Sequence, residues 1–350
     1  MNVSDYKCLS CSANLRFDPI SQKWVCDYCT SSFTKDEIIK AYGTDENLKN
    51  ETEQKLDSDY SCYNCPSCGA EIISDDTTTA TFCVYCGSNA IIKNKLKGKF
   101  NPSKVIPFKT TKEDAIKAFK AYKKGKLFMP DEFTNSNNIE KISGIYIPFF
   151  IYDCDVESDL NIIGTRVKHW STASYRYTKT DFYNLKRCAS VHFENIPVDG
   201  ATKFPDDIMN SIEPFNYDEL QDFSPSYLTG FLSERFDIDK NQLFEIAKVR
   251  ASQSTEQAVL SQITSYVTKT IESKNHKITE NDTSEYVLLP VWMLNVKFKD
   301  KMYTFAMNGQ TGKFVGNVPV DWKKFWKYWT LIFSGSLLLT SLFVILFNLR

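Results

Sequence analysis

Two copies of one cysteine pattern lie in the first quarter of the chain. Each copy consists of two CxxC pairs separated by fourteen residues. One CxxC turn brings two thiolates to a metal ion, and two such turns complete a tetrahedral shell of four sulfurs. The predicted ligands are Cys8, Cys11, Cys26 and Cys29 in the first copy, and Cys65, Cys68, Cys83 and Cys86 in the second. We therefore expect two structural Zn²⁺ sites, because a shell of four cysteines leaves no open position for catalysis.

Disulfides and redox-active CxxC pairs are the alternatives, and the repeated spacing favours zinc over both. The apolar residues near the cysteines are few: Phe17, Trp24 and Phe33 in the first copy, and Ile72, Ile73, Phe82 and Ile91 in the second. A core this small predicts that the metal supplies most of the folding free energy. Cys62 competes with Cys65 as a ligand, although Cys65 preserves the spacing. Cys154 and Cys188 are expected to be buried thiols.

Composition limits the remaining possibilities. The chain has 350 residues with 42% hydrophobic content, which suits two or three domains. Its net charge is -1, so the chain as a whole lacks the excess of positive charge that is typical of nucleic-acid-binding proteins. Thiolates available for zinc indicate a reducing compartment. The polar, cysteine-rich segment from Met1 to Cys29 lacks the apolar stretch of a secretory signal.

The carboxyl-terminal segment predicts a membrane anchor. Residues Tyr328 to Phe347 carry no charge over twenty positions, which is long enough to span the hydrocarbon of a bilayer. Aromatic and basic residues gather at the start of the apolar run: Trp322, Lys323, Lys324, Trp326, Lys327, Tyr328 and Trp329. The excess of lysine on this side predicts that the large amino-terminal part is cytoplasmic. A buried core helix is the alternative, and it would need a polar face or a shorter apolar run.

The expected fold class is α+β, with two small zinc ribbons, a mainly antiparallel α+β body and one transmembrane helix. The predicted boundaries are 1–43 for the first ribbon, 44–60 for an acidic linker, 61–97 for the second ribbon, 98–320 for the body and 321–350 for the anchor. This arrangement predicts a single-span, tail-anchored protein of the cell membrane.

Several elements of the body can be predicted from pattern. Residues 110–126 have the cap and apolar stripe of a helix. Ile145–Asp155 and Tyr286–Phe298 are similar apolar strands that each contain a proline, which is compatible with an internal duplication and indicates bulges or edge positions. Asn308-Gly309 predicts a hairpin turn. Spaced apolar residues predict one long or two shorter helices over 241–277, and no elements are assigned within 156–240.

Four stretches carry a resemblance to a known family over nearly the whole chain. They are KCLSCSANLRFDPISQKWVCDYC, VIPFKTTKEDAIKAFKAYKKGKLFMPDEF, GIYIPFFIYDCDV and LLPVWMLNVKFKDKMYTFAMNGQTGKFVG. Together they resemble bacterial TFIIB-type zinc-ribbon-containing membrane proteins, with the last stretch the most distinctive. The sequence departs from the family pattern at Ser10, Ser12 and Thr30, where proline and glycines are commoner. This departure predicts less ideal turns around the first set of cysteines.

The resemblance implies a role in envelope stress. Similar proteins are thought to hold a phage-shock-protein-A-like coat protein and a flotillin-like SPFH protein at the membrane, with the ribbons as docking surfaces. Similar chains have also been labelled primosomal helicases. This chain has no phosphate-binding loop, because Gly312-Lys313 is followed by Phe314 and lacks the upstream glycine.

No catalytic grouping can be recognised from the sequence, and we expect a non-enzymatic protein with no small-molecule substrate. His169, His192 and His276 are isolated and are interpreted as satisfied or surface histidines. The acidic run Asp153, Asp155, Glu157 and Asp159 has the period of a strand face. A solvated face is favoured there over a cation site.

The sequence therefore predicts a membrane-anchored adaptor that recruits cytoplasmic proteins through its ribbons. Nucleic-acid binding is the rival interpretation, because zinc ribbons often contact DNA or RNA and the stretch from Lys93 to Lys126 is locally basic. That stretch could instead contact anionic lipid, at about 1 kcal/mol per lysine. In the first ribbon, Lys7, Arg16 and Lys23 are balanced by Asp5, Asp18 and Asp27, which favours a protein partner over nucleic acid.

Overall fold

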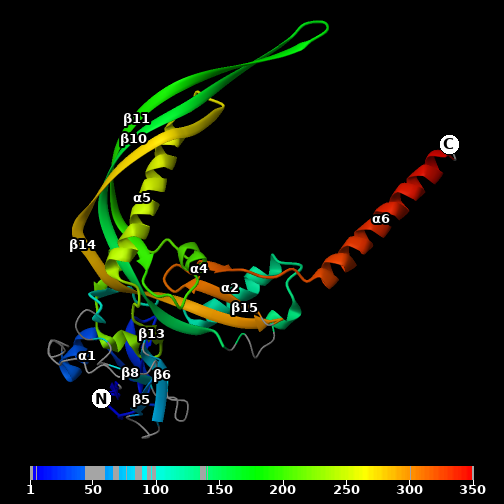
Figure 1. Cartoon of the computed structure of the whole chain (residues 1–350). Coiled ribbons are helices and arrows are strands. Elements are labelled where there is room, and N and C mark those ends of the chain that lie inside the picture. Colours follow the sequence, from blue (N-terminus) through cyan, green and yellow to red (C-terminus); the bar gives the residue numbers. More distant parts are fainter. Residues whose placement is uncertain are drawn as a thin grey trace.

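The computed structural model has an α+β fold with mostly antiparallel sheets, as predicted (Figure 1). It describes residues 3–4, 6–43, 60–65, 71–75, 77–82, 89–92, 96, 100–134, 139, 141–299 and 301–348. The predicted linker 44–60 lies outside these residues except for Tyr60. The largest sheet of the described residues has eleven strands, and its longest path runs β1-β8-β7-β13-β10-β14-β15-β16.

The elements of the ribbon regions are short. The first ribbon comprises β2 (Leu15–Asp18), β3 (Lys23–Cys26), β4 (Ser32–Phe33) and α1 (Lys35–Tyr42). The second region comprises β5 (Tyr60–Asn64), β6 (Glu71–Asp75), β7 (Thr78–Phe82) and β8 (Asn89–Ile92). β8 pairs with β1 (Val3–Ser4) and β7 pairs with β13 (Leu232–Glu234), so the second region is joined to the main sheet.

Three very long strands form a curved arm that rises from the body (Figure 1). These strands are β10 (Ser143–Ser171), β11 (Arg176–Asp199) and β14 (Thr268–Phe298). β10 lies between the other two and pairs antiparallel with both. Pairing with β14 stops at Thr165, so beyond that residue the arm is a two-stranded hairpin. The arm accounts for about half of the region 156–240 that the sequence left unassigned.

Helix α5 (Lys240–Gln262) lies along the concave side of the arm (Figure 1). Val259 of the helix and Ile263 directly after it pack with Leu160 and Ile162 of β10 in one buried cluster. The alternation of buried and exposed residues along β10 follows from this cover, because successive side chains of a strand point to opposite faces. Burial of one face of the arm against α5 therefore stabilises a hairpin that would be marginal alone.

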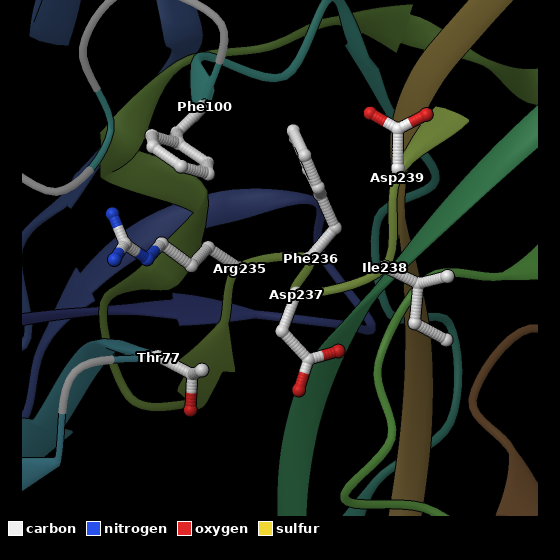
Figure 2. Close-up of a pocket in the computed structure, with 7 residues that line it drawn as sticks. All are labelled: Thr77, Phe100, Arg235, Phe236, Asp237, Ile238 and Asp239. Carbon is white, nitrogen blue, oxygen red and sulfur yellow. The ribbon is translucent and has the colours of Figure 1, made fainter. Parts of the chain in front are cut away.

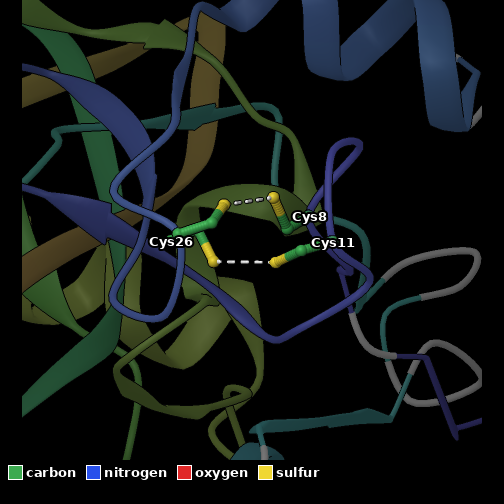
Figure 3. A group of neighbouring side chains, drawn as sticks. Cys8, Cys11 and Cys26 are labelled. Carbon is green, nitrogen blue, oxygen red and sulfur yellow. Dashed lines mark hydrogen bonds between the residues drawn. The ribbon is translucent and has the colours of Figure 1, made fainter.

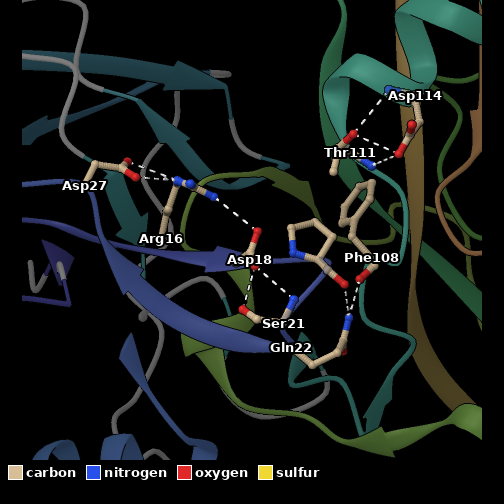
Figure 4. Close-up of polar contacts among 9 residues, drawn as sticks. Arg16, Asp18, Ser21, Gln22, Asp27, Phe108, Thr111 and Asp114 are labelled. Atoms are coloured by element: carbon tan, nitrogen blue, oxygen red, sulfur yellow. Dashed lines mark hydrogen bonds and ion pairs between the residues drawn. The ribbon is translucent and has the colours of Figure 1, made fainter. Parts of the chain in front are cut away.

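At the base of the arm, both faces of the sheet are covered. Helix α2 (Lys112–Lys124) packs Phe119 against Phe305 on one face. On the other face, helix α4 (Asp206–Ser211) packs with alternate residues of β10 and β14. α2 begins at Thr111, whose side chain and that of Asp114 form a capping box, which confirms the helix predicted over 110–126 (Figure 4).

The body contains two halves with the same order of elements. The first is β9 (Lys104–Val105), α2, β10 and β11, and the second is β13, α5, β14 and β15 (Lys301–Asn308). The parallel pairings also correspond, since β9 lies beside β14 and β13 lies beside β10. The register partners Ile147 and Leu289 are equivalent positions, and each is followed by the proline noted in the sequence. This arrangement supports the internal duplication suggested by the two strand sequences.

The two prolines lie in central strands rather than at sheet edges, and the reason is a change of partner. On one side of β10, β13 pairs up to Tyr146 and β11 pairs from Phe149, so Pro148 falls between the two partners. On β14, β9 pairs up to Leu288 and β15 pairs from Val291, so Pro290 falls in the equivalent gap. Proline lacks an N–H, and no ladder bond is required at either position.

Two predictions over the second half of the body have different outcomes. The hairpin is confirmed, because β15 pairs with β16 (Phe314–Gly316) around the turn that begins at Asn308. The helical prediction for 241–277 is correct only for 240–262, because β14 already begins at Thr268. The first part of that strand is mostly polar, so its sequence does not show the alternation of apolar and polar residues that is typical of a strand. The remaining short elements are β12 (Gln221–Asp222) and the 3₁₀ turns Asp131–Thr134, Tyr217–Glu219 and Pro225–Leu228.

The chain ends in helix α6 (Trp322–Asn348), which extends away from the body (Figure 1). Between Trp322 and Ile345 it is long and apolar enough to cross a membrane, and none of that segment is buried against the protein. Large apolar side chains such as Leu338 and Leu339 are each 70% exposed. Its first turns contact the body, where Phe325 packs on Phe128. A core helix would be covered, so its exposure argues against that alternative.

Candidate metal centre

The four cysteines of the first copy come together as the sequence predicts (Figure 3). Their sulfur atoms all lie within 4.8 Å of one another. Cys8 and Cys29 are 3.5 Å apart at sulfur, as are Cys11 and Cys26. With Zn–S bonds of about 2.3 Å, a tetrahedral site places its sulfurs about 3.8 Å apart. The cluster therefore has the donor type and spacing to hold a metal ion.

The two turns that present the cysteines have the same backbone geometry. Ser12 N donates to Cys8 O and Thr30 N donates to Cys26 O, both at 2.9 Å. Each turn is then closed by a bond from the first cysteine: Cys8 N donates to Ala13 O, and Cys26 N donates to Ser31 O. The matched hydrogen bonds fix two sulfurs per turn on one side of the ribbon.

Two residues of the cysteine turns, Ser12 and Thr30, have strained backbone conformations. Ser12 and Thr30, each directly after the second cysteine of a turn, have φ angles of 61° and 60°. L-residues disfavour this left-handed region, and β-branched Thr30 does so more strongly. The expectation of less ideal turns at these positions is confirmed. The hydrogen bonds of the turns hold both residues in place.

Neighbouring groups shift the pKa values of Cys29 and Cys11 in opposite directions. The Ser31 hydroxyl, 3.2 Å from Cys29 Sγ, and the Ser31 backbone N–H lower the pKa of Cys29 to about 6. The backbone N–H of Ala13 lowers the pKa of Cys11, but desolvation and the three neighbouring thiols raise it to about 12. Four thiolates this close would repel one another, and a bound dication would offset that repulsion.

The ribbon that carries the site is docked on the body. Trp24 is fully buried, and its Nε1 donates to Ser226 O at 2.9 Å. Phe17 and Trp24 both pack on the ring of Tyr227, with centroids 5.2 Å apart in each pair. Gln22 Nε2 donates to Phe108 O at 2.8 Å (Figure 4). The small core predicted for the ribbon is therefore part of the main core, and the metal is not its only source of stability.

The outer ends of the two turns expose apolar side chains. Leu9, inside the first CxxC, is 48% exposed, and Tyr28, inside the second, is 84% exposed. Arg16 beside them is neutralised by Asp27, with Nε 3.0 Å from each carboxylate oxygen (Figure 4). The metal-site end of the ribbon thus presents a mixed surface that is not basic.

Only part of the second predicted site can be placed. Cys65 is buried beside Tyr63, Ala90 and Ile92. Cys68, Cys83 and Cys86 lie outside the described residues, and so does the side chain of Cys62. The second site therefore stays a prediction.

The predicted acidic run lies on the solvent face of β10, as expected. Asp155 is 2.7 Å from His192 Nδ1, and Glu157 is 3.3 Å from Lys277. The hydrogen bond from His192 lowers the pKa of Asp155, and the same bond raises the pKa of His192. Cys188 is paired with Asp159 on this exposed face, so the prediction that it is buried was wrong, whereas Cys154 is buried. The other two acids are Asp153 and Asp159, and Asp153 accepts from Asn195 N.

One polar network could not be found from the sequence. His276 Nδ1 is 2.7 Å from Ser158 Oγ, and its Nε2 is 2.9 Å from Glu256 Oε1. The group joins β10, β14 and α5, and Ser158 is only 3% exposed. A hydroxyl closed off from solvent suits a structural bond that holds α5 on the arm. His169 bonds to Thr178 Oγ1 across the arm hairpin.

A shallow pocket of about 340 Å³ lies beside α5 (Figure 2). Its lining residues are Thr77, Phe100, Arg235, Phe236, Asp237, Ile238 and Asp239. Arg235 stacks on Phe100 at 4.1 Å, Asp237 accepts from Thr202, and Asp239 caps α5. These charged groups serve the fold, and the absence of an enzyme activity stays a prediction.

The fold and site define an α+β protein with a cluster of four cysteines that could hold a metal ion, and with an apolar helix long enough to span a membrane. A curated relative in Bacillus subtilis (strain 168), the uncharacterized protein YdjG, is 33% identical over 329 residues, which covers 80% of this chain and 96% of YdjG. The chain therefore belongs to the same family as YdjG. No family model matches the chain, and no solved structure matches it.

Proposed function

We propose that this protein is a non-enzymatic adaptor, anchored in the cell membrane by α6, that recruits cytoplasmic proteins through its zinc ribbons. The observation that carries this proposal is the pairing of a docked ribbon, with Leu9 and Tyr28 exposed beside its metal site, and an apolar helix that the protein leaves uncovered. Zn²⁺ suits the four-thiolate site, and a second Zn²⁺ is proposed for Cys65, Cys68, Cys83 and Cys86.

Helix α6 has the properties of a single membrane span. Hydroxyl groups in the apolar segment donate back to the helix, as Thr330 Oγ1 does to Trp326 O and Thr340 Oγ1 does to Ser336 O, each at 3.0 Å. Such bonds satisfy polar side chains where hydrocarbon offers no partner. Lys323, Lys324 and Lys327 at its beginning favour a cytoplasmic location for the body and ribbons.

The ribbon offers a partner a preformed surface. Leu9 and Tyr28 lie within the two CxxC turns, so the metal fixes the position of each. A rigid apolar contact loses little conformational entropy on binding. The resemblance noted above implies phage-shock-protein-A-like and SPFH-like proteins as partners in envelope stress, and they are the first candidates for this surface.

Nucleic-acid binding stays the alternative function. Residues 1–43 contain five lysines and arginines and five aspartates and glutamates, so the ribbon has no net charge. In the basic stretch, Lys104 pairs with Asp222 and Lys109 pairs with Glu219. Phosphate binding needs uncompensated cations, so both observations favour a protein partner.

The test is a pull-down of the full chain from detergent-solubilised membranes, read by mass spectrometry. Wild type is compared with Leu9→Ser/Tyr28→Ser and with Cys8→Ser/Cys11→Ser. We expect both variants to lose coat-type or SPFH-type partners, while only the cysteine variant loses zinc from the first site. Ile20→Ser, at a residue 69% exposed in the same ribbon, and Cys188→Ser are matched controls that should keep both zinc and partners.

Two outcomes would contradict the proposal. Partners retained by both ribbon variants would remove the first ribbon as the docking surface. Nuclease-sensitive complexes in place of protein partners would establish the nucleic-acid function. Deletion of Tyr328–Arg350 should release the protein into the cytosol, and a truncated protein that stays with membranes would show that α6 is not the anchor.

A further inference from the structure

The end of the arm is the most exposed part of the body. Beyond the last pairing with β14, the hairpin of residues 166–181 has no third strand and reaches past the end of α5 (Figure 1). Every residue from 168 to 180 is exposed. A structural loop in this position would be expected to carry small polar residues. Instead, three large aromatic side chains are exposed there, Trp170, Tyr175 and Tyr177, and Phe182 is exposed directly after them, with exposed fractions between 43% and 72%.

The same segment is strongly basic. Residues 164–187 contain six lysines and arginines and one aspartate, in a chain whose net charge is -1. Arg166 and Lys168 on β10 and Lys179 on β11 share one face of the hairpin, because Lys168 pairs directly with Lys179 and Arg166 pairs with Asp181. Asp181 is 2.9 Å from Lys179 and compensates only one of the three cations.

The arrangement is unfavourable for the hairpin itself. Like charges directly opposite in a ladder destabilise the pair. The neighbouring cross-strand pair is Trp170 and Tyr177, stacked with centroids 5.5 Å apart and open to solvent. A surface that keeps opposed lysines next to exposed stacked aromatics is best explained by a ligand that is anionic and partly apolar.

From these observations we propose that the tip of the arm binds the anionic surface of the membrane. Along the hairpin, Trp170 and Tyr177 lie nearer the tip than Lys168 and Lys179, and Tyr175 lies beyond them beside Arg176. This order matches a bilayer interface, where aromatic rings lie at the headgroup level and lysines reach the phosphates. Each lysine near an anionic surface contributes about 1 kcal/mol.

The placement of the arm agrees with this partner. The start of α6 combines the same residue types, with Trp322 and Trp326 beside Lys323 and Lys327. Figure 1 shows the arm and α6 both extending away from the first ribbon. A second contact would restrict rotation of the body about its single anchor and keep the ribbon turned away from the bilayer. This inference rests on the proposed membrane anchoring by α6.

The test measures hydrogen exchange in the full chain held in lipid nanodiscs. One preparation contains phosphatidylcholine alone, and the other contains phosphatidylcholine with phosphatidylglycerol. We expect amides of residues 166–181 to exchange about tenfold more slowly in the anionic discs, which corresponds to about 1.4 kcal/mol. Added salt should reverse the difference, since surface charges are screened.

Two tip variants and one control sharpen the test. Lys168→Glu/Lys179→Glu and Trp170→Ser/Tyr177→Ser should both abolish the slow exchange, and neither touches the core because all four side chains are exposed. Lys120→Glu/Lys124→Glu, an equal change of charge on the exposed side of α2, should preserve it.

The possible outcomes separate this inference from the anchor. Equal exchange of the tip in both discs, with the protein bound to each, would overturn the tip contact and leave the anchor intact. Failure to co-purify with any disc would contradict the anchor, and sedimentation of the same chain with phosphatidylglycerol vesicles would then decide the tip contact alone. Protection by a mixed-sequence single-stranded oligonucleotide but not by lipid would assign the tip to nucleic acid and overturn the proposal.

Discussion

The two halves of the body make the same backbone hydrogen bond at the end of a strand, but with different side chains beside it. At the end of β11, Gly200 N donates to Pro148 O at 2.9 Å, and at the end of β15, Gly309 N donates to Pro290 O at 2.8 Å. The residue before each glycine is buried and bonds the backbone two positions ahead. That residue is Asp199 in the first half and Asn308 in the second. The two halves therefore have an acid and an amide at equivalent positions, and the effects of the two side chains can be compared.

Both the nitrogen and the oxygen of the Asn308 amide have hydrogen-bond partners, whereas one oxygen of the Asp199 carboxyl has none. Asn308 Nδ2 donates to Ile212 O and Pro214 O, and its Oδ1 accepts from Gln310 N and Thr311 N. In contrast, Asp199 accepts from one backbone N–H, and its Oδ2 has no hydrogen-bond partner. The two halves therefore share the backbone geometry. They differ in how many hydrogen bonds the buried side chain makes.

The strongest way to break this comparison is to place the acid in the second half. In Asn308→Asp, a carboxylate would face the carbonyls of Ile212 and Pro214, which can only repel it. We expect a loss of about 4 kcal/mol at neutral pH, because a buried charge would lose its partners. Urea unfolding of the protein in mild detergent measures the loss. The exposed Asn184→Asp is the control, and a similar small effect for both would refute the role given to Asn308.

A second comparison uses the two glycines. A Cβ at Gly309 would lie 2.6 Å from Phe108 and 2.8 Å from Pro290, whereas one at Gly200 would lie 3.0 Å from Phe236 Cβ. We expect Gly309→Ala to cost about 3 kcal/mol and Gly200→Ala about 1 kcal/mol, because the tighter site must displace a buried ring. The same urea titration ranks the two variants, and a reversed order would contradict the packing argument.

The parts of this protein that could be predicted from its sequence depend on local chemistry. The first cysteine cluster, the capping box at Thr111 and the turn at Asn308 each follow from residues close together in the chain. The docking of the ribbon could not be predicted, because Trp24 and Ser226 are 202 positions apart. That contact requires the whole fold to be known.

The arm was missed for a different reason. Strand prediction relies on contrast between a buried and an exposed face, and residues 168–180 are exposed on both. Around Ile271 the apolar positions are sparse enough to fit a helix, and the pairing of this strand with β10 overrides that local preference. The aromatic and basic residues of the tip are noticeable in its composition, but they do not follow the alternation by which a strand is predicted.

The environment of Asp199 makes its contribution to the stability of the first half depend on pH. Desolvation is the main cause that raises the pKa of Asp199 to about 7, and the backbone N–H of Ala201 opposes it. The carboxylates of Asp206 and Asp237 raise the pKa further, and the guanidinium of Arg250 lowers it. The ordinary value is 3.8, so the folded state binds the proton more tightly than the unfolded state does.

The comparison is sharpened by replacing this acid with the amide of the other half. Because the pKa is raised on folding, the stabilisation from protonated Asp199 is complete below about pH 4 and is lost as the pH rises through about 7. Asp199→Asn removes this dependence, so we expect it to stabilise the protein by about 2 kcal/mol at pH 8 and much less at pH 4.5. Urea titrations at both pH values test this, with the exposed Asp218→Asn as control. A gain that is equal at the two pH values would mean that the buried charge is not what distinguishes the halves.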